Sequence, residues 1–314
     1  MTRTGVGGTV ALRHGLLTSG LVLTVCAVLA VVAGTAFASA ARELDTVAAR
    51  TFGVLDQRGD DLVLRWTPTG GVERLDPVEL AGTPPPSGTV TEVAYDPADP
   101  RRPLVPGAAL LATADAALGT IHLAATVALL VVATGAWQLV SRRRAARRPT
   151  RTLTARRVRI QNGMLGRSWL ETESRPQRWI PVHFDPVLVT LPSPAEVRVR
   201  GDPLTDRLVA VEIDGRLLHP SGPVRATEPR GRRRDNPGPS HGAPPDAASV
   251  ERAARLAPLR RRLQADLPLV LAAPVGAALW AYVDGGGLPT WAGTTALLAA
   301  AALWVAALRG SDPS

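Results

Sequence analysis

Long charge-free runs of apolar residues alternate with polar stretches along the chain. Four such blocks are residues 15–41, 116–141, 267–283 and 288–308. Crossing the ~30 Å hydrocarbon core of a bilayer takes a helix of about 17–25 residues, and every block reaches that range. A soluble core would spread its apolar positions with a helical or strand period instead. The pattern therefore predicts four transmembrane helices and excludes a soluble enzyme.

The first block has two interpretations. It follows Arg3 and Arg13 and contains the small-residue sequence Ala38-Ser39-Ala40, which is typical of signal-peptide cleavage, here after Ala40. Its 27 uncharged residues exceed the ~7–15 of a usual signal-peptide core, which favours an uncleaved anchor. Either interpretation places the following segment on the far side of the membrane.

Residues 42–115 predict a small β module between the first two helices. Leu62, Leu64 and Trp66 alternate with Val63 and Arg65, the period of a half-buried strand. A turn at residues 67–71 and a return arm at 72–75 predict a hairpin, and residues 89–95 predict a further strand. Three or four strands give a thin core, so this module needs support from the bilayer or a partner.

Residues 142–225 predict a basic, β-rich domain. Residues 197–200 and 209–213 alternate between aliphatic and other residues, and Asp214-Gly215 is a hairpin turn signal, with another turn at Asn162-Gly163. We expect a barrel or sandwich of five or six strands. Its bulky core candidates are Trp169, Trp179, Ile180, Val182 and Phe184.

The remaining segments connect these parts. Residues 226–249, rich in proline, glycine and arginine, predict a disordered linker, and residues 250–265 a basic juxtamembrane helix interrupted near Pro258. Residues 1–14 and 309–314 form the termini. The expected fold class is a membrane α-helical protein of four transmembrane helices, with a small extracytoplasmic β module and a small cytoplasmic β-rich domain.

The placement of arginine predicts the orientation. Residues 42–115 carry 7 arginines and 12 acidic residues, whereas residues 142–266 carry 26 arginines and 13 acidic residues. Arginine-rich segments beside spanning helices stay in the cytoplasm. We therefore expect a plasma-membrane protein with both termini and the basic domain in the cytoplasm. Residues 42–115 and the short turn at 284–287 would lie outside.

Composition narrows the chemistry. All 36 basic residues are arginine, which excludes a Schiff-base or phosphate-loop lysine, and the single cysteine, Cys26, excludes an internal disulfide. The sequence also lacks the metalloprotease signature H-E-x-x-H, the nucleophile signature G-x-S-x-G and both glycine-rich phosphate-binding signatures. We therefore expect no catalytic residue, cofactor or metal.

One motif resembles a known family. Val93-Ala94-Tyr95-Asp96-Pro97-Ala98-Asp99-Pro100, shortly before the second block, is similar to the V-x-Y-D-P-x-x-P signature of a bacterial membrane-protein family of unknown function. The resemblance covers roughly residues 15–140 and implies a β module between two spanning helices. It implies no reaction, cofactor or catalytic residue. The layout of the whole chain also resembles uncharacterised four-pass actinobacterial membrane proteins.

Arginine clusters beside the second and third blocks are the strongest local signal. Such clusters fix topology, and they also bind anionic lipid headgroups at about 1 kcal/mol per residue. Nucleic acid is the weaker alternative, because no recognised motif is present and stacking aromatics are few. The candidate lipid contacts are Arg142, Arg143, Arg144, Arg147, Arg148, Arg260, Arg261 and Arg262.

Other polar residues favour structural roles. His183 and Asp185 can share one strand face, and His122 lies within the second block, where an ionisable group is a functional candidate. Acidic residues of the outer module fall at turn positions, where aspartate shapes loops. These are Asp56, Asp60, Asp61, Asp96 and Asp99. Acid–base catalysis is the alternative for this set, and a calcium site is an alternative for Asp56, Asp60 and Asp61.

Two hypotheses on function follow. The first is a non-enzymatic scaffold, assembly or envelope-sensing component whose partners are the lipid bilayer and an unknown membrane or envelope protein. The second is a membrane-bound enzyme, or an accessory subunit of an enzyme or transport complex, with the acidic outer loops near its active site. Transport by the chain itself is disfavoured, because the four blocks hold no Asp, Glu or Arg in their interiors.

Overall fold

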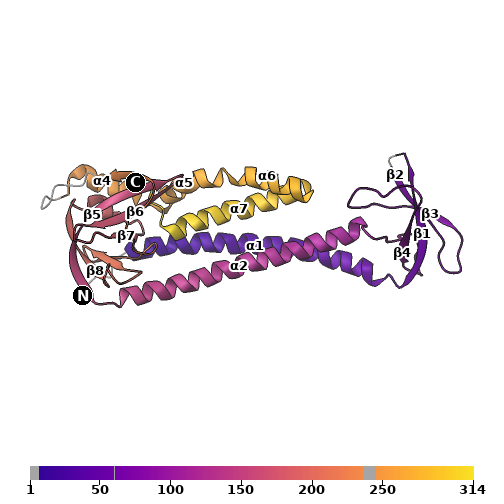
Figure 1. Cartoon of the computed structure of the whole chain (residues 1–314), viewed down its shortest axis with the longest axis horizontal. Coiled ribbons are helices and arrows are strands. Elements are labelled where there is room, and N and C mark those ends of the chain that lie inside the picture. The colour runs from indigo at the N-terminus through magenta and orange to yellow at the C-terminus, as the bar shows by residue number, and fades with distance from the viewer. Residues whose placement is uncertain (1–6, 60, 236–244) are drawn as a thin grey trace. The chain divides into compact units, whose positions relative to one another are not determined.

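The computed structural model describes residues 7–59, 61–235 and 245–314 of the chain (Figure 1). It divides into two compact units. The small unit is Cys26–Val127, and the large unit combines Met1–Val25 with Ala128–Ser314. Helices α1 (Gly7–Asp45) and α2 (Ala109–Ala146) each belong partly to both units.

Four helical stretches are long and apolar enough to span a membrane, as the apolar blocks predict. Only 17–22% of the most apolar window of each is buried inside the protein, so their aliphatic side chains largely face outward. Outward-facing apolar surface along a whole helix is what a lipid environment favours. The stretches are Leu12–Asp45, Ala109–Ala146, Leu259–Asp284 and Gly287–Arg309.

The third stretch consists of two helices, α5 (Leu259–Val270) and α6 (Ala273–Asp284). A separate helix, α4 (Ala247–Leu256), ends before Pro258, and Pro258 forms the N-cap of α5. Helix α6 follows after a two-residue break and has a proline in its first turn, where no donor is lost. Gly285, at φ 67°, ends α6, and α7 (Gly287–Arg309) returns beside it (Figure 1). The basic segment 259–262 thus begins the same helical stretch that becomes apolar.

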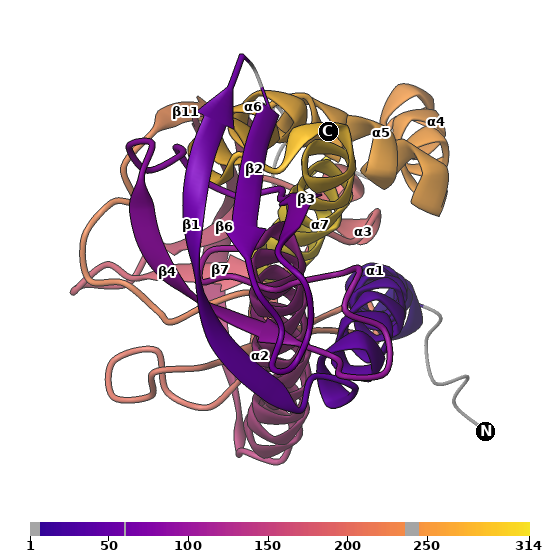
Figure 2. The same ribbon diagram turned by 90° about the vertical axis from the view of Figure 1, so that its right-hand side faces the viewer.

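The small unit contains a four-stranded antiparallel sheet in the order β3-β2-β1-β4 (Figure 2). The predicted hairpin is confirmed, because β2 (Asp61–Trp66) pairs with β3 (Arg74–Pro77), and the last predicted strand coincides with β4 (Thr89–Tyr95). The central strand β1 (Ala49–Arg58) was not predicted. One sheet face forms a core with loop residues; this core contains Leu55, Leu64, Trp66, Val93, Tyr95 and Val105.

The large unit contains a seven-stranded antiparallel sheet, one or two strands more than predicted. Its main path is β10-β9-β8-β5-β6-β7, and β11 also pairs with β5. The turns at Asn162-Gly163 and Asp214-Gly215 join paired strands as expected, and all five predicted core residues are buried. The strands are β5 (Thr150–Asn162), β6 (Leu165–Thr172), β7 (Trp179–Val182), β8 (Ala195–Arg200), β9 (Ala210–Ile213), β10 (Arg216–Leu218) and β11 (Arg232–Asp235), with the short helix α3 (Val187–Thr190) after β7.

Strand β11 and the start of α4 at Ala247 lie within the segment predicted to be a disordered linker, so that prediction is wrong for Arg232–Asp235 and for residues 247–249. Polar contacts replace the missing apolar residues. Arg233 donates to Glu171 at 2.8 Å and to Asp235 at 2.7 Å, and it lies over the ring of Trp179. Residues 236–244 of the predicted linker lie outside the described residues.

Candidate functional site

Buried polar side chains, together with the half-buried Arg142, connect the sheet of the large unit to the ends of the apolar helices. We call this set the junction network. It draws residues from α1, α2, α5, the tail after α7 and three segments of the sheet domain, so three of the candidate membrane-spanning stretches contribute side chains and the fourth is joined through the tail that follows it. Its members are His14, Arg142, Arg157, Ser168, His183, Arg262, Asp266, Ser311 and Asp312.

The strongest link is an ion pair between β5 and the C-terminal tail. Arg157 donates to Asp312 Oδ2 at 2.8 Å, and the two side chains are 3% and 0% exposed. The hydroxyl of Ser168 donates to the same oxygen at 2.6 Å. Burial opposes ionisation of Asp312, but Arg157, Ser168 and Ser314 outweigh it and hold the pKa of Asp312 below its usual value. The carboxylate is therefore charged and fully engaged.

The same tail joins the sheet through its backbone. The amide of Asp312 donates to the carbonyl of Gly166 at 2.9 Å, and Ser311 forms a bridge with Arg167 of β6. The tail begins directly after α7, so this pairing fixes the end of that helix against the sheet. A tail that follows an apolar helix is thus an integral part of the β domain.

Helices α1 and α5 meet at the other side of Ser311. Its hydroxyl donates to Asp266 Oδ2 at 3.2 Å, and His14 Nε2 lies 3.5 Å from the same oxygen. His14 and Asp266 are both buried. This is a close approach and not a hydrogen bond, because His14 Nε2 has no hydrogen-bond partner among the described residues.

Phe184, two residues after the end of β7, links α5 to the sheet. Arg262 of α5 is 2% exposed and donates to the carbonyl of Phe184 at 3.0 Å. The guanidinium groups of Arg262 and Arg157 also lie over the Phe184 ring, at 5.2 and 5.7 Å from its centre. Cation–π contacts of desolvated arginines contribute about 2 kcal/mol. These contacts hold α5 in one position against β5.

Helix α2 enters the network through Arg142. Its guanidinium lies 2.7 Å from His183 Nε2 and 2.9 Å from Gln138 Oε1. Burial, reinforced by the charge of Arg142, holds the pKa of His183 well below its usual value. A neutral imidazole can accept a hydrogen bond from Arg142, so His183 serves as an acceptor at neutral pH.

The network has the composition of a structural joint. Its guanidinium groups are hydrogen-bonded or stacked internally, Asp312 is paired with Arg157, and within the described ranges no three His, Cys, Asp or Glu side chains converge as metal ligands do. Buried charged groups that satisfy each other penalise every arrangement that separates them. The junction therefore keeps the helix ends and the β domain in a single arrangement.

The predicted arginine contacts divide into two groups. Three are used internally: Arg142 and Arg262 in the junction network, and Arg148 in an ion pair with Asp206 at 2.6 Å. The other five have exposed side chains: Arg143, Arg144, Arg147, Arg260 and Arg261.

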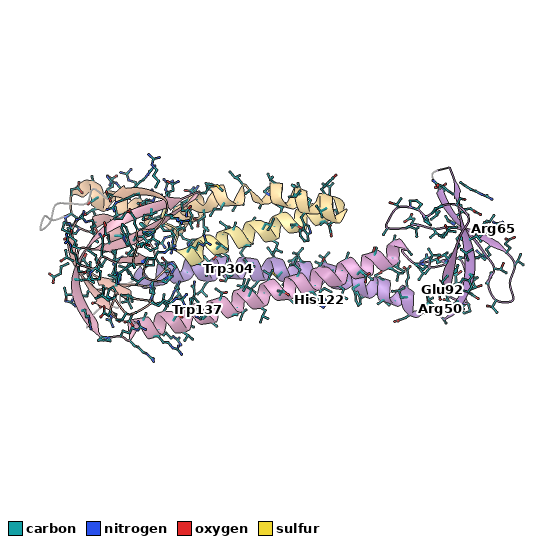
Figure 3. All side chains as sticks on the ribbon, viewed as in Figure 1. Arg50, Arg65, Glu92, His122, Trp137 and Trp304 are labelled. Atoms are coloured by element: carbon teal, nitrogen blue, oxygen red, sulfur yellow. The ribbon has the colours of Figure 1, made fainter. Side chains whose placement is uncertain are left out.

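The other predicted residues are not brought together. His183 contacts Arg142, whereas Asp185 accepts from Arg216 and from the amide of Val187. His122 is exposed on α2 (Figure 3). Asp96 and Asp99 accept from backbone amides two residues ahead, which confirms their turn-shaping role. Asp56 binds Ser87 and Arg65, Asp61 begins β2, and Asp60 lies outside the described residues.

Sequence reasoning missed most of the junction. The partners Arg157 and Asp312 are 155 residues apart in sequence, and no local sequence pattern predicts a pair at that separation. One signal was present: His14 and Asp266 each adjoin an apolar block, and ionisable residues there are functional or structural candidates by default. No family model, curated protein or solved structure matches this chain.

Proposed function

We propose that the chain is a four-pass plasma-membrane protein that works as a non-enzymatic assembly or envelope-sensing component. In this proposal both termini and the large unit's sheet are cytoplasmic, and the small unit's sheet is extracytoplasmic. The arginine bias of the chain supports this orientation, because residues 142–266 carry 26 arginines and residues 42–115 carry 7.

The junction network is the observation that carries the role. It joins residues from three of the apolar stretches, and the tail that follows the fourth, to one β domain through contacts such as the buried pair Arg157–Asp312. Displacement of the tail after α7 would separate the buried charges of Arg157 and Asp312, at a cost of about 3–5 kcal/mol. The β domain would therefore move together with the ends of the helices. This coupling suits a sensing or assembly role and requires no catalytic reaction.

The small unit offers a surface for a partner. Phe52 and Val90 are 72% and 66% exposed on the sheet face opposite its core. On that face they lie among the ion pairs Arg50–Glu92 and Arg65–Asp56, whose arginines and Glu92 Figure 3 labels. Large apolar side chains rimmed by polar groups are typical of protein interaction sites.

The five exposed arginines beside α2 and α5 would bind anionic lipid headgroups under the same proposal. Each basic residue near an anionic surface contributes about 1 kcal/mol. Their role would be to hold the cytoplasmic side of the protein against the membrane.

A crosslinking experiment in native membranes tests the partner role. The full chain is crosslinked, purified, and its protein adducts are identified by mass spectrometry. We expect an adduct that is lost in the variant Phe52→Ser/Val90→Ser. The matched control, Met164→Ser/Leu204→Ser, removes two similarly exposed apolar side chains from the large unit and should retain it. Identical adducts in all three chains would refute a partner at this face.

The enzyme hypothesis predicts a different result. If the chain is an enzyme, alanine at Asp96, Asp99 or His122 would abolish its function in cells, as a deletion of the gene does, while the protein level stays unchanged. Under our proposal these substitutions leave the phenotype intact, because the two aspartates bind backbone amides and His122 is exposed.

A further inference from the structure

A second arginine cluster, separate from the helix-flanking ones, lines a pocket in the large unit. The pocket has a volume of about 510 Å³. Arg167 comes from β6, Arg225 and Arg230 from the loop between β10 and β11, and Arg309 from the last turn of α7. Among the described residues, no acidic side chain lines it. This grouping of four like charges is not explained by the junction network.

The four guanidinium groups are not neutralised. Within the described part of the chain, none of them has a carboxylate oxygen within 4.0 Å, although many other arginines of this domain do. Arg167 instead donates to the carbonyl of Arg309 at 2.8 Å and to the carbonyl of Ser221 at 3.0 Å. Glu228 lies between Arg225 and Arg230 in sequence, but its carboxylate pairs with Arg233 at 3.3 Å and not with either of them. The pocket therefore holds uncompensated positive charge.

The pocket is held in shape before any ligand arrives. Trp169 is buried, and the guanidinium groups of Arg167 and Arg225 lie over its ring, at 5.0 and 5.6 Å from the centre. Arg309 is fixed by the pairing of the following tail with β6. Burial, together with the charges of Arg225 and Arg309, lowers the pKa of Arg167 to about 10. A bound anion would relieve this repulsion.

The chemistry of the lining identifies the anion. Guanidinium groups present paired donors that match the oxygens of phosphate, and the volume of this pocket lies within the ~300–1,000 Å³ of small-molecule ligand sites. Arg309 is the final residue of an apolar helix, where the headgroup phosphates of a bilayer would lie. We propose that this pocket binds a phosphomonoester, supplied either by an anionic lipid headgroup or by a soluble phosphate compound. The proposal goes beyond the assembly role and does not depend on it.

Calorimetric titration of the full chain in a neutral detergent tests the site. The probes are dioctanoyl phosphatidic acid, dioctanoyl phosphatidylcholine and inorganic phosphate. We expect phosphatidic acid or inorganic phosphate to bind at least about tenfold more tightly than phosphatidylcholine. Binding of phosphatidic acid alone identifies the lipid source, and equal binding of inorganic phosphate identifies the soluble source.

Two variants assign the binding to this pocket. Arg225→Gln/Arg309→Gln should weaken it at least about tenfold, because two phosphate contacts are lost. The control Arg175→Gln/Arg207→Gln removes two exposed arginines of the same unit, outside the pocket, and should bind like the wild type. If the pocket variant unfolds at a lower temperature without ligand, Arg230→Gln replaces it, since Arg230 is exposed. Absence of wild-type binding to both phosphate probes, or equal binding by pocket variant and control, overturns the proposal.

Discussion

The two units place their charges differently. In the large unit the Arg157–Asp312 pair is 3% and 0% exposed, whereas in the small unit Arg50 and Glu92 are 77% and 46% exposed. Both pairs have similar distances, 2.8 and 3.0 Å. Asp76, bound by Trp66 and Arg74, is the most buried carboxylate of the small unit's described ion pairs. The difference teaches that the geometry of an ion pair says little about its energetic effect until its burial is known.

The largest effect should come from breaking the buried pair. Asp312→Ala leaves the Arg157 guanidinium buried without its partner, which typically costs about 3–5 kcal/mol. We expect the large unit to become susceptible to limited proteolysis while the small unit stays resistant. Fragment masses from the detergent-solubilised chain measure this. Proteolysis that spreads equally to both units would contradict the assignment of Asp312 to a local joint.

A substitution in the other unit should reverse the pattern. Leu64 is fully buried in the thin core of the small unit, and Leu64→Ala in such a site costs about 2–5 kcal/mol. The same proteolysis assay should then show cleavage within the small unit's sheet and protection of the large unit. Intact small-unit fragments at wild-type levels would show that its core is stronger than its size implies.

Acidity should act on the large unit through His183. The folded state keeps the pKa of His183 well below 6.5, its usual value, so only the unfolded state gains a proton as pH falls below that value. Stability is therefore complete above pH 6.5 and declines below it, by about 1.4 kcal/mol per pH unit for this group. Thermal unfolding between pH 7.5 and 5 measures the slope.

His183→Gln provides the control for that slope. Glutamine retains an acceptor for Arg142 but does not titrate, so the variant should show a smaller decline on acidification. His219, whose pKa is also lowered by burial and by Arg142, accounts for part of the remainder. An unchanged slope in the variant would show that His183 does not contribute to the loss of stability at low pH.

The smallest effect should come from the exposed pair. Glu92→Ala breaks the contact with Arg50 on the open face of the small sheet. Exposed ion pairs contribute less than about 1 kcal/mol, so proteolysis and thermal unfolding should match the wild type. A loss comparable to that of Asp312→Ala would contradict the contrast between the two units.

Local patterns predicted the elements whose signals are local. Apolar length alone located the four candidate spans, and the alternation of Leu62, Leu64 and Trp66 located β2. The Asp214-Gly215 sequence located the hairpin turn between β9 and β10, where both residues have positive φ. Strand β1 was missed because Gly53 interrupts its alternation; a Cβ there would lie 2.8 Å from Leu64.

Features that depend on distant partners could not be predicted. Strand β11 is arginine-rich and gains its order from Glu171 and Trp179, more than 50 residues earlier. Likewise, Asp312 lies in a tail that has no helical or strand period of its own. Arg142 and Arg262 resemble their exposed neighbours in sequence, and only packing distinguishes the junction residues from the five exposed arginines.

Accessibility of one cysteine in each unit tests most directly whether the two sheets lie on opposite sides of a membrane. In a Cys26→Ser background, Val72→Cys labels the small unit and Leu204→Cys the large unit, both at exposed positions. A membrane-impermeant maleimide is applied to intact cells and again after permeabilisation. We predict that Val72→Cys reacts in intact cells and Leu204→Cys only after permeabilisation. Reaction of Leu204→Cys in intact cells, or protection of Val72→Cys, would contradict the proposed topology.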